Sequence, residues 1–204
     1  MNLKTILNGS VLFIGLGLVV FSRLNGFQIR VGIEEVPVDS VGTEVNGQNA
    51  IASDNGIIPE VWQVKPGSIY DGDTLRVVRG DEELKIRFCG IDAPEKKMPM
   101  GVASRDHLRS LVDISDGEVL LVPIEKDRYG RTVAEVYVKD SRSTAINLNV
   151  QMVRDGYAWH YEKYSGNCPI RGEFAIAQEL AQKESLGIWN GNPQPPWEWR
   201  RANK

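Results

Sequence analysis

Residues 71–95 read DGDTLRVVRGDEELKIRFCGIDAPE, and the rest of the chain is organised around this stretch. Two short apolar runs, 75–78 and 84–88, flank a charged turn, which is the composition of a β-hairpin. A hairpin brings the start of its first strand close to the end of its second, because the chain returns antiparallel to itself. We therefore expect Asp73 and Asp92 to meet in space.

The side chains at these strand ends suggest two kinds of ligand. Asp73 and Asp92 offer hard carboxylate oxygens, which suit Ca²⁺ or Mg²⁺. Arg87 precedes Asp92 by five positions, and its planar guanidinium suits a phosphate. The hairpin alone thus predicts a cation site beside a phosphate site.

Charge is distributed unevenly along the 204 residues, although the formal net charge is only −3. Residues 24–60 hold one basic and six acidic side chains, whereas residues 61–204 hold 21 of each sign. The second segment is therefore neutral overall. Any affinity for nucleic acid must come from a local basic cluster and not from a global field.

The N-terminal segment, residues 1–23, contains 18 uncharged residues from Thr5 to Ser22. This length lies between a signal-peptide core and a full membrane span, and no small-x-small cleavage site follows it. We expect an uncleaved signal-anchor that tethers the chain to the membrane, with a cleaved signal peptide as the alternative. The remainder would then lie outside the cytoplasm in the cell envelope, or be secreted. Residues 24–60 resemble a flexible acidic linker.

From residue 61 the alternation of short apolar runs and turns predicts a mainly β, α+β domain. Predicted strands cover 61–64 with 68–70, then 74–78, 84–88, 118–124 and 133–138. Predicted helices, about three, cover 103–112, 145–155 and 174–186, and Tyr157 to Trp159 returns as a short strand. This order matches a five-stranded OB-fold β-barrel over residues 61–190, followed by an irregular Pro/Trp-rich tail at 191–204.

Cys89 and Cys168 are too few for a disulfide scaffold or a zinc site. They would form one bridge in an oxidising compartment, or remain as two buried thiols, and their spacing does not decide between these. Two histidines, His107 and His160, are too few and too scattered for a histidine-based nuclease.

Four motifs together resemble the thermonuclease family, whose type member is staphylococcal nuclease. They are Asp71-Gly72-Asp73-Thr74, Arg87 with Asp92-Ala93-Pro94-Glu95, Asp127-Arg128-Tyr129-Gly130-Arg131 and Leu186-Gly187-Ile188-Trp189. The resemblance spans roughly residues 61–190 in consistent order. Each motif is modest alone, but their joint occurrence is specific.

The resemblance implies a Ca²⁺ site. Asp73 and Asp92 would bind the ion through carboxylate oxygens, together with the backbone carbonyl of Ala93. The type member has threonine at this last position, but a carbonyl ligand does not depend on the side chain. Asp71 would act from outside the coordination sphere, through water.

The resemblance also implies catalytic roles. Glu95 would be the general base that activates water. Arg87 and Arg131 would stabilise the charge that builds on the phosphate during attack. Tyr129 and Tyr164 would contact the nucleotide. The substrates would be DNA and RNA, cut with little sequence preference to 3′-phosphates and 5′-hydroxyls by a monomer without a protein partner.

Two other functions are compatible with parts of this pattern. One is a non-catalytic OB-fold module that binds nucleic acid, and the other is an envelope domain that binds calcium only for structure. The presence of Arg87, Glu95 and Arg131 beside both aspartates favours the nuclease, since neither alternative needs all five residues.

Overall fold

The computed structural model describes residues 59–203, so the expected segment 1–23 and nearly all of the linker 24–60 lie outside the described residues. The strands are β1 Glu60–Val64, β2 Thr74–Arg79, β3 Glu82–Phe88, β4 Ile91–Asp92, β5 Glu118–Lys126, β6 Thr132–Lys139, β7 Ala145–Asn147 and β8 Trp159–His160. The helices are α1 Gly101–Asp113, α2 Leu148–Arg154, α3 Arg171–Lys183 and α4 Pro196–Ala202, with short 3₁₀ turns η1 Glu162–Tyr164 and η2 Gly187–Trp189. Between residues 59 and 203, no helix combines the length and apolarity needed to cross a membrane.

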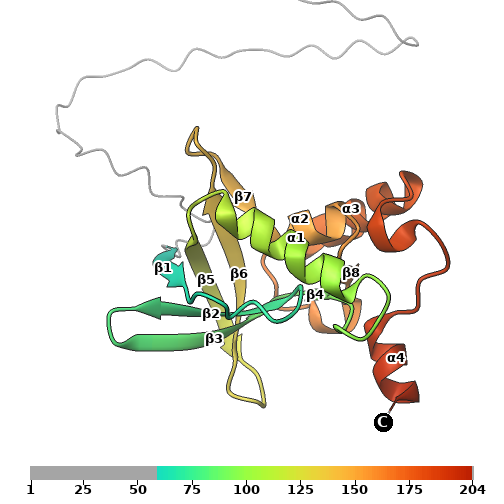
Figure 1. Ribbon diagram of the computed structural model, residues 1–204, viewed down its shortest axis with the longest axis horizontal. Coiled ribbons are helices and arrows are strands. Elements are labelled where there is room, and N and C mark those ends of the chain that lie inside the picture. Colours follow the sequence, from blue (N-terminus) through green and yellow to red (C-terminus); the bar gives the residue numbers. More distant parts are fainter. Residues whose placement is uncertain (1–58, 204) are drawn as a thin grey trace, which may run out of the picture. The chain divides into compact units, whose positions relative to one another are not determined.

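The main sheet has the strand order β3-β2-β1-β5-β6-β7, and β3 also pairs in parallel with β6 (Figure 1). Strands β1, β2, β3, β5 and β6 therefore form a continuous ring of pairings, and β6 also pairs with β7. This ring and the four helices confirm the predicted α+β, OB-like fold.

The central hairpin has the predicted register. Thr74 at the start of β2 lies opposite Arg87 at the end of β3, and the pairing continues to Arg79 opposite Glu82. Strand β4 follows and pairs with β8, which places Asp92 opposite Trp159. The two aspartates are thus brought together by a hairpin and a second, two-stranded sheet.

The core lies between the sheet and α1, α2 and α3, which gather beside it in Figure 1. Leu75, Ile86 and Val136 are fully buried from the strands, and Met152 and Phe174 are fully buried from α2 and α3. Burying a large apolar side chain contributes about 1.5–3 kcal/mol. The β2–β3 hairpin is therefore anchored by the same hydrophobic core that packs the helices against the sheet.

Three predicted elements are wrong in part. Residues 145–147 are the strand β7 and not the start of the helix, because they pair with β6 and because the Asn147 side chain caps α2 by accepting from the Val150 amide at 3.0 Å. Residues 68–70 are not a strand, since the Ser68 hydroxyl takes over the bonding to the Arg76 backbone. The tail is not irregular throughout: α4 begins at Pro196, a residue favoured in the first helical turn.

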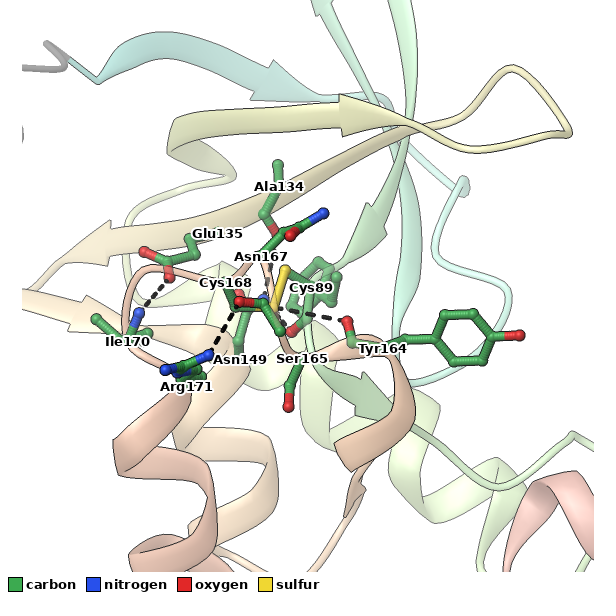
Figure 2. The surroundings of a disulfide bond; sticks show 12 residues. Cys89, Ala134, Glu135, Asn149, Tyr164, Ser165, Asn167, Cys168, Ile170 and Arg171 are labelled. Carbon is green, nitrogen blue, oxygen red and sulfur yellow. Dashed lines mark hydrogen bonds between the residues drawn. A yellow bond between two sulfur atoms is a disulfide. The ribbon is translucent and has the colours of Figure 1, made fainter.

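Cys89 and Cys168 form a disulfide in the structure, with their Cα atoms 6.0 Å apart (Figure 2). Cys89 follows β3 directly, and Cys168 lies in the loop between η1 and α3. Both side chains are buried. The bridge ties the end of the central hairpin to the segment that carries Tyr161 and Tyr164.

Asn149 is a fully buried amide that joins α2 to the sheet. Its Oδ1 accepts from the Val136 amide at 3.0 Å, and its Nδ2 donates to the carbonyls of Cys89 and Ala134 at 3.0 and 3.1 Å. These bonds link α2 to backbone groups at the end of β3 and along β6; the Ala134 carbonyl also accepts from the Cys89 amide at 2.9 Å.

Candidate active site

The candidate site is a cavity of about 650 Å³ that the ends of several elements share. Its walls come from the β2–β3 hairpin, β4, the turn between β5 and β6, the segment 161–164 and α4. All nine predicted catalytic, metal-binding and nucleotide-contacting residues line it: Asp71, Asp73, Arg87, Asp92, Ala93, Glu95, Tyr129, Arg131 and Tyr164.

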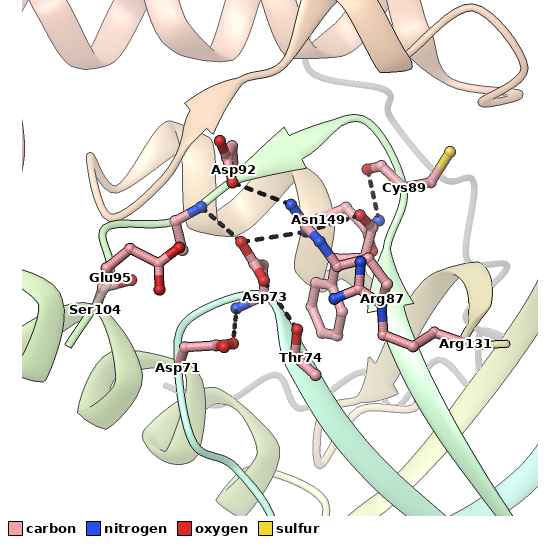
Figure 3. Close-up of polar contacts among 12 residues, drawn as sticks. Asp71, Asp73, Thr74, Arg87, Cys89, Asp92, Glu95, Ser104, Arg131 and Asn149 are labelled. Atoms are coloured by element: carbon pink, nitrogen blue, oxygen red, sulfur yellow. Dashed lines mark hydrogen bonds and ion pairs between the residues drawn. The ribbon is translucent and has the colours of Figure 1, made fainter. Parts of the chain in front are cut away.

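Asp73 and Asp92 converge on the Arg87 guanidinium (Figure 3). Arg87 Nη1 lies 3.1 Å from Asp73 Oδ2, and its Nη2 lies 3.1 Å from Asp92 Oδ1. The Ala93 amide donates to Asp73 Oδ2 at 2.7 Å, and the Thr74 hydroxyl donates to Asp73 Oδ1 at 3.0 Å. Both carboxylates are almost fully buried, so their positions are fixed by the surrounding backbone.

Gly72 explains why the first motif needs glycine. A Cβ at this position would collide with the hydroxyl of Ser104 on α1. Ser104 is itself fully buried and donates to the Tyr157 carbonyl at 2.7 Å, so it cannot move aside cheaply. The close packing of α1 against Gly72 therefore helps to fix the segment that carries Asp71 and Asp73.

The carboxylates of the site are crowded. Burial and the charge of Asp73 raise the pKa of Asp92 to about 6, although Arg200 and Arg87 oppose the rise. Burial and the charge of Asp73 likewise raise the pKa of Asp71 to about 7. Desolvation and like-charge repulsion both disfavour ionised carboxylates, so this part of the cavity favours a nearby cation.

A calcium ion fits the donor set of this cavity. Two buried carboxylates converge to within hydrogen-bond distance of one guanidinium, and Ca²⁺ prefers such oxygen ligands. Among residues 59–203 no group of three or more histidine, cysteine, aspartate or glutamate side chains forms a ligand cluster. Asp73 and Asp92 would therefore need backbone carbonyls or water to complete the coordination. Asp71 accepts from the Asp73 amide at 3.2 Å and so contacts Asp73 through its backbone.

Glu95 lies at the edge of the cavity, and 38% of its side chain is exposed. A turn fixes its backbone, since its carbonyl accepts from the Met98 amide at 2.7 Å. Its carboxylate accepts from Arg200 Nη1 at 2.7 Å. The side chain is thus reachable by solvent and by a ligand in the cavity, but it is held by an arginine.

Arg131 reaches the cavity from the turn between β5 and β6. Asp127 shapes this turn, because its Oδ1 accepts from the amides of Tyr129 and Arg131 and its Oδ2 lies 2.7 Å from Arg131 Nε. Burial would raise the pKa of Asp127, but these bonds outweigh it and lower the pKa. Asp127 thus holds the Arg131 side chain through Nε, and Arg131 lines the cavity. The Tyr129 ring centroid lies 5.5 Å from the Arg131 guanidinium carbon.

The predicted nucleotide-contacting tyrosines are both exposed. The exposed fraction is 68% for Tyr129 and 58% for Tyr164. Tyr164 packs edge-on against Tyr161, which stacks in turn on Trp197 of α4 at 4.9 Å with an interplanar angle of 5°. An exposed aromatic surface therefore borders the cavity.

Sequence reasoning missed Arg200 as a residue of this cavity. Arg200 lies on α4 and donates to both Asp92 and Glu95. The available signal was local: Pro196 followed by Glu198 and two arginines is typical of a short helix with its charges matched to the dipole. No local pattern, however, indicates which side chain of such a helix turns inward.

Comparison with known proteins gives a consistent family. The protein-family model described as Staphylococcal nuclease homologue matches residues 85–191. This range contains Arg87, Asp92, Glu95 and Arg131 but begins after Asp73. An uncharacterized endonuclease of Haemophilus influenzae is 41% identical over 138 residues, which cover 67% of this chain and 71% of that protein. An uncharacterized endonuclease of Escherichia coli O157:H7 is 38% identical over 133 residues, covering 65% of this chain and 80% of that protein.

A protein named micrococcal nuclease from Shigella flexneri is 36% identical over 141 residues, covering 67% of this chain and 79% of its own. The matches agree with the motifs, with the α+β fold and with the cavity in which those motifs meet. The chain belongs to the staphylococcal nuclease family of phosphodiester hydrolases.

Proposed function

We propose that the chain is a calcium-dependent nuclease that hydrolyses DNA and RNA with little sequence preference. One observation carries the proposal: eight residues chosen from three separate motifs, together with Tyr164, line a single cavity. The names of the similar proteins from Haemophilus influenzae and Shigella flexneri support nuclease activity. Calcium dependence rests on the donor set of the cavity and on the family.

Asp73, Asp92 and the carbonyl of Ala93 would hold the ion. Bound Ca²⁺ would neutralise the charge of the phosphate and polarise it toward attack. Arg87 pairs with both aspartates and lines the same cavity, so it would contact the same phosphate. These residues would bind and orient the scissile group.

Glu95 would take a proton from a water molecule, whose oxygen attacks the phosphorus. The bond from phosphorus to the 5′ oxygen breaks, and the leaving oxygen takes up a proton to give a 5′-hydroxyl and a 3′-phosphate. Arg87 and Arg131 would stabilise the negative charge on the remaining phosphate oxygens. Tyr129 and Tyr164 would provide surfaces on which bases stack without sequence readout.

The test is digestion of a supercoiled plasmid and of a single-stranded RNA by the full chain, with Ca²⁺ or with a chelator. We expect cleavage of both substrates with Ca²⁺ and none with the chelator. Cleavage that persists in chelator would remove the metal from the proposal. Retarded migration of the nucleic acid without cleavage, in Ca²⁺ and from a folded sample, would point instead to a binding module.

We also propose that the domain works outside the cytoplasm, tethered by residues 1–23. The disulfide between Cys89 and Cys168 supports this location, because such bonds persist mainly in oxidising compartments. Fractionation of cells that produce the full chain, followed by protease treatment of intact cells, tests it. If the domain stays protected from protease until the cells are broken, the result contradicts the proposal.

A further inference from the structure

Arg200 occupies the position of a cation in the candidate active site. Its Nη2 lies 2.6 Å from Asp92 Oδ2, and its Nη1 lies 3.3 Å from Asp92 Oδ1 and 2.7 Å from Glu95 Oε1. With Arg87 on the other side, both carboxylate oxygens of Asp92 accept from guanidinium groups. These two acids are the ones to which the proposed function assigns calcium binding and water activation.

The helix that carries Arg200 is short. α4 has seven residues, begins at the buried Pro196 and ends close to the C-terminus (Figure 1). It rests on the cavity rim through the stack of Trp197 on Tyr161 and through the Arg200 ion pairs. A helix of this length is marginal by itself, so its position depends on these few contacts.

Arg200 in this position conflicts with both proposed roles of the acids. A cation bound to Asp92 would use the lone pairs that Arg200 now engages, and it would lie next to a second positive charge. Glu95 Oε1 accepts a charge-assisted bond of 2.7 Å from Arg200, so this oxygen is already engaged and is not free to accept a proton from water. The two arrangements therefore exclude each other.

We propose that Arg200 is a further residue of the active site, supplied by the C-terminal helix, that competes with calcium for Asp92 and holds Glu95 unavailable until calcium binds. The inference rests on the proposed calcium site. Calcium displaces the guanidinium from Asp92, which frees Glu95 and loosens α4. Arg200 thereby sets the calcium concentration at which the enzyme becomes active.

The expected size of the effect follows from the competition. The apparent dissociation constant for calcium is the intrinsic constant divided by the fraction of molecules in which Asp92 is free. Because 38% of the Arg200 side chain is exposed, solvent weakens its ion pairs. We therefore expect Asp92 to be free in about one molecule in ten, rather than in about one in a thousand. Removing Arg200 should therefore tighten calcium binding about tenfold.

The experiment measures calcium binding by isothermal titration calorimetry on the full chain, with no nucleic acid present. The variants are Arg200→Ala and the matched control Arg201→Ala. Arg201 is the next residue of α4 and is exposed. We expect Arg200→Ala to bind calcium about tenfold more tightly than the parent and Arg201→Ala to bind like the parent. Equal or weaker binding by Arg200→Ala overturns the inference.

A second measurement uses the parent chain and needs no substitution. Trypsin cleaves after arginine, and α4 offers Arg200 and Arg201. If calcium displaces Arg200, cleavage within α4 should become faster when calcium is added, as followed by mass spectrometry. Cleavage that is unchanged or slower in calcium contradicts the inference.

The two proposals fail in different ways. If the folded parent and Arg200→Ala both bind no calcium, the calcium site of the proposed function is wrong, and the inference falls with it. If both bind calcium with the same affinity, only the inference is wrong. Nuclease activity adds a further separation: Arg200→Ala should exceed the parent at limiting calcium, and the excess should shrink as the calcium concentration rises.

Discussion

Single residues of the cavity differ in how much of their role the sequence reveals. Asp73, Arg87 and Asp92 could be placed together from the sequence because a hairpin must return to its own start, and the structure pairs them at 3.1 Å. Arg200 could not, because its contact with Asp92 spans 108 positions of the chain and follows no local rule. Long-range contacts of single side chains are set by packing, which has no signature in spacing.

The proposed base gives the first prediction. Replacing Glu95 by glutamine removes the proton acceptor but keeps the size of the side chain, so turnover should fall by about 10²–10⁴-fold. Affinity for nucleic acid should change little. Initial rates of plasmid cleavage and fluorescence anisotropy of a labelled oligonucleotide measure the two quantities.

The control for this change is Glu179→Gln, an exposed carboxylate on α3. It should leave both quantities as in the parent. Unchanged turnover in Glu95→Gln would exclude the residue as the base.

Arg131 gives a second prediction, because its terminal nitrogens contribute to the cavity while its Nε is held by Asp127. Arg131→Ala should lower turnover by about 10²–10³-fold, the usual cost of losing one group that stabilises transition-state charge. Steady-state kinetics in saturating calcium measure it. Arg142→Ala, in another exposed turn, is the matched control and should be silent; a loss of similar size there would point to a non-specific charge effect.

At the scale of elements, the strands of the sheet were easier to predict than the helix boundaries. Apolar alternation located β2, β3, β5 and β6 correctly, because each has one face in the core. The prediction failed at β7, where pairing with β6 overrides a helical pattern, and at α4, which is too short for periodicity. Tertiary contacts decide such short elements, and their propensities do not.

The attachment of α2 to the sheet depends on Asn149. Asn149→Leu keeps the volume of the side chain but removes the bonds that Asn149 makes to the Val136 amide and the Cys89 carbonyl, whereas the Ala134 carbonyl keeps its bond from the Cys89 amide. We expect the free energy of unfolding to fall by about 3 kcal/mol, since unsatisfied buried groups cost about 1–3 kcal/mol each. Urea denaturation measures it.

Asn192→Leu, at an exposed position of the tail, should change stability by less than about 0.5 kcal/mol. A variant Asn149→Leu as stable as the parent would mean that the backbone groups find other partners.

The contact between α1 and the end of α2 predicts a dependence on pH. His107 Nε2 lies 2.7 Å from Asp155 Oδ2, and Gln151 donates to the other oxygen at 2.8 Å. Burial would raise the pKa of Asp155, but these bonds prevail and lower it. Asp155 therefore stabilises the fold above its unfolded pKa of about 3.9, and this stability is lost as pH falls through the lower pKa of the folded state.

Asp155→Ala should lower the free energy of unfolding by about 1 kcal/mol at pH 7, and the difference from the parent should shrink below about pH 4. Thermal unfolding between pH 7 and pH 2.5 measures the difference. Asp113→Ala, exposed on α1, should show no such trend. A difference that stayed constant with pH would assign the loss to packing and not to ionisation.

For the domain as a whole, the order of apolar runs predicted the α+β fold and the family motifs predicted the residues that line the cavity, but neither predicted how the cavity is closed. The disulfide shows the limit, because spacing left the bridge and two free thiols equally open. The structure joins two residues that lie 79 positions apart. Only the path of the whole chain brings such positions within 6.0 Å.

The bridge gives a prediction for the domain as a whole. Closing a loop of 79 residues lowers the entropy of the unfolded chain, which corresponds to about 4 kcal/mol of stability. The double variant Cys89→Ala, Cys168→Ala should lose about that much, and reduction of the parent should lose a similar amount. Urea denaturation measures both. Two free thiols in a non-reducing mass measurement of the parent would show that the bridge does not form in solution.

The parallel pairing of β3 with β6 has a consequence for when activity arises. Arg87 pairs with Val133, so the partner of β3 is synthesised more than forty residues later. The cavity also includes Tyr164, whose segment the bridge fixes. A nascent chain therefore holds its acidic residues and arginines apart. Synthesis must therefore pass residue 164 before the cavity can form and any cleavage of nucleic acid can begin.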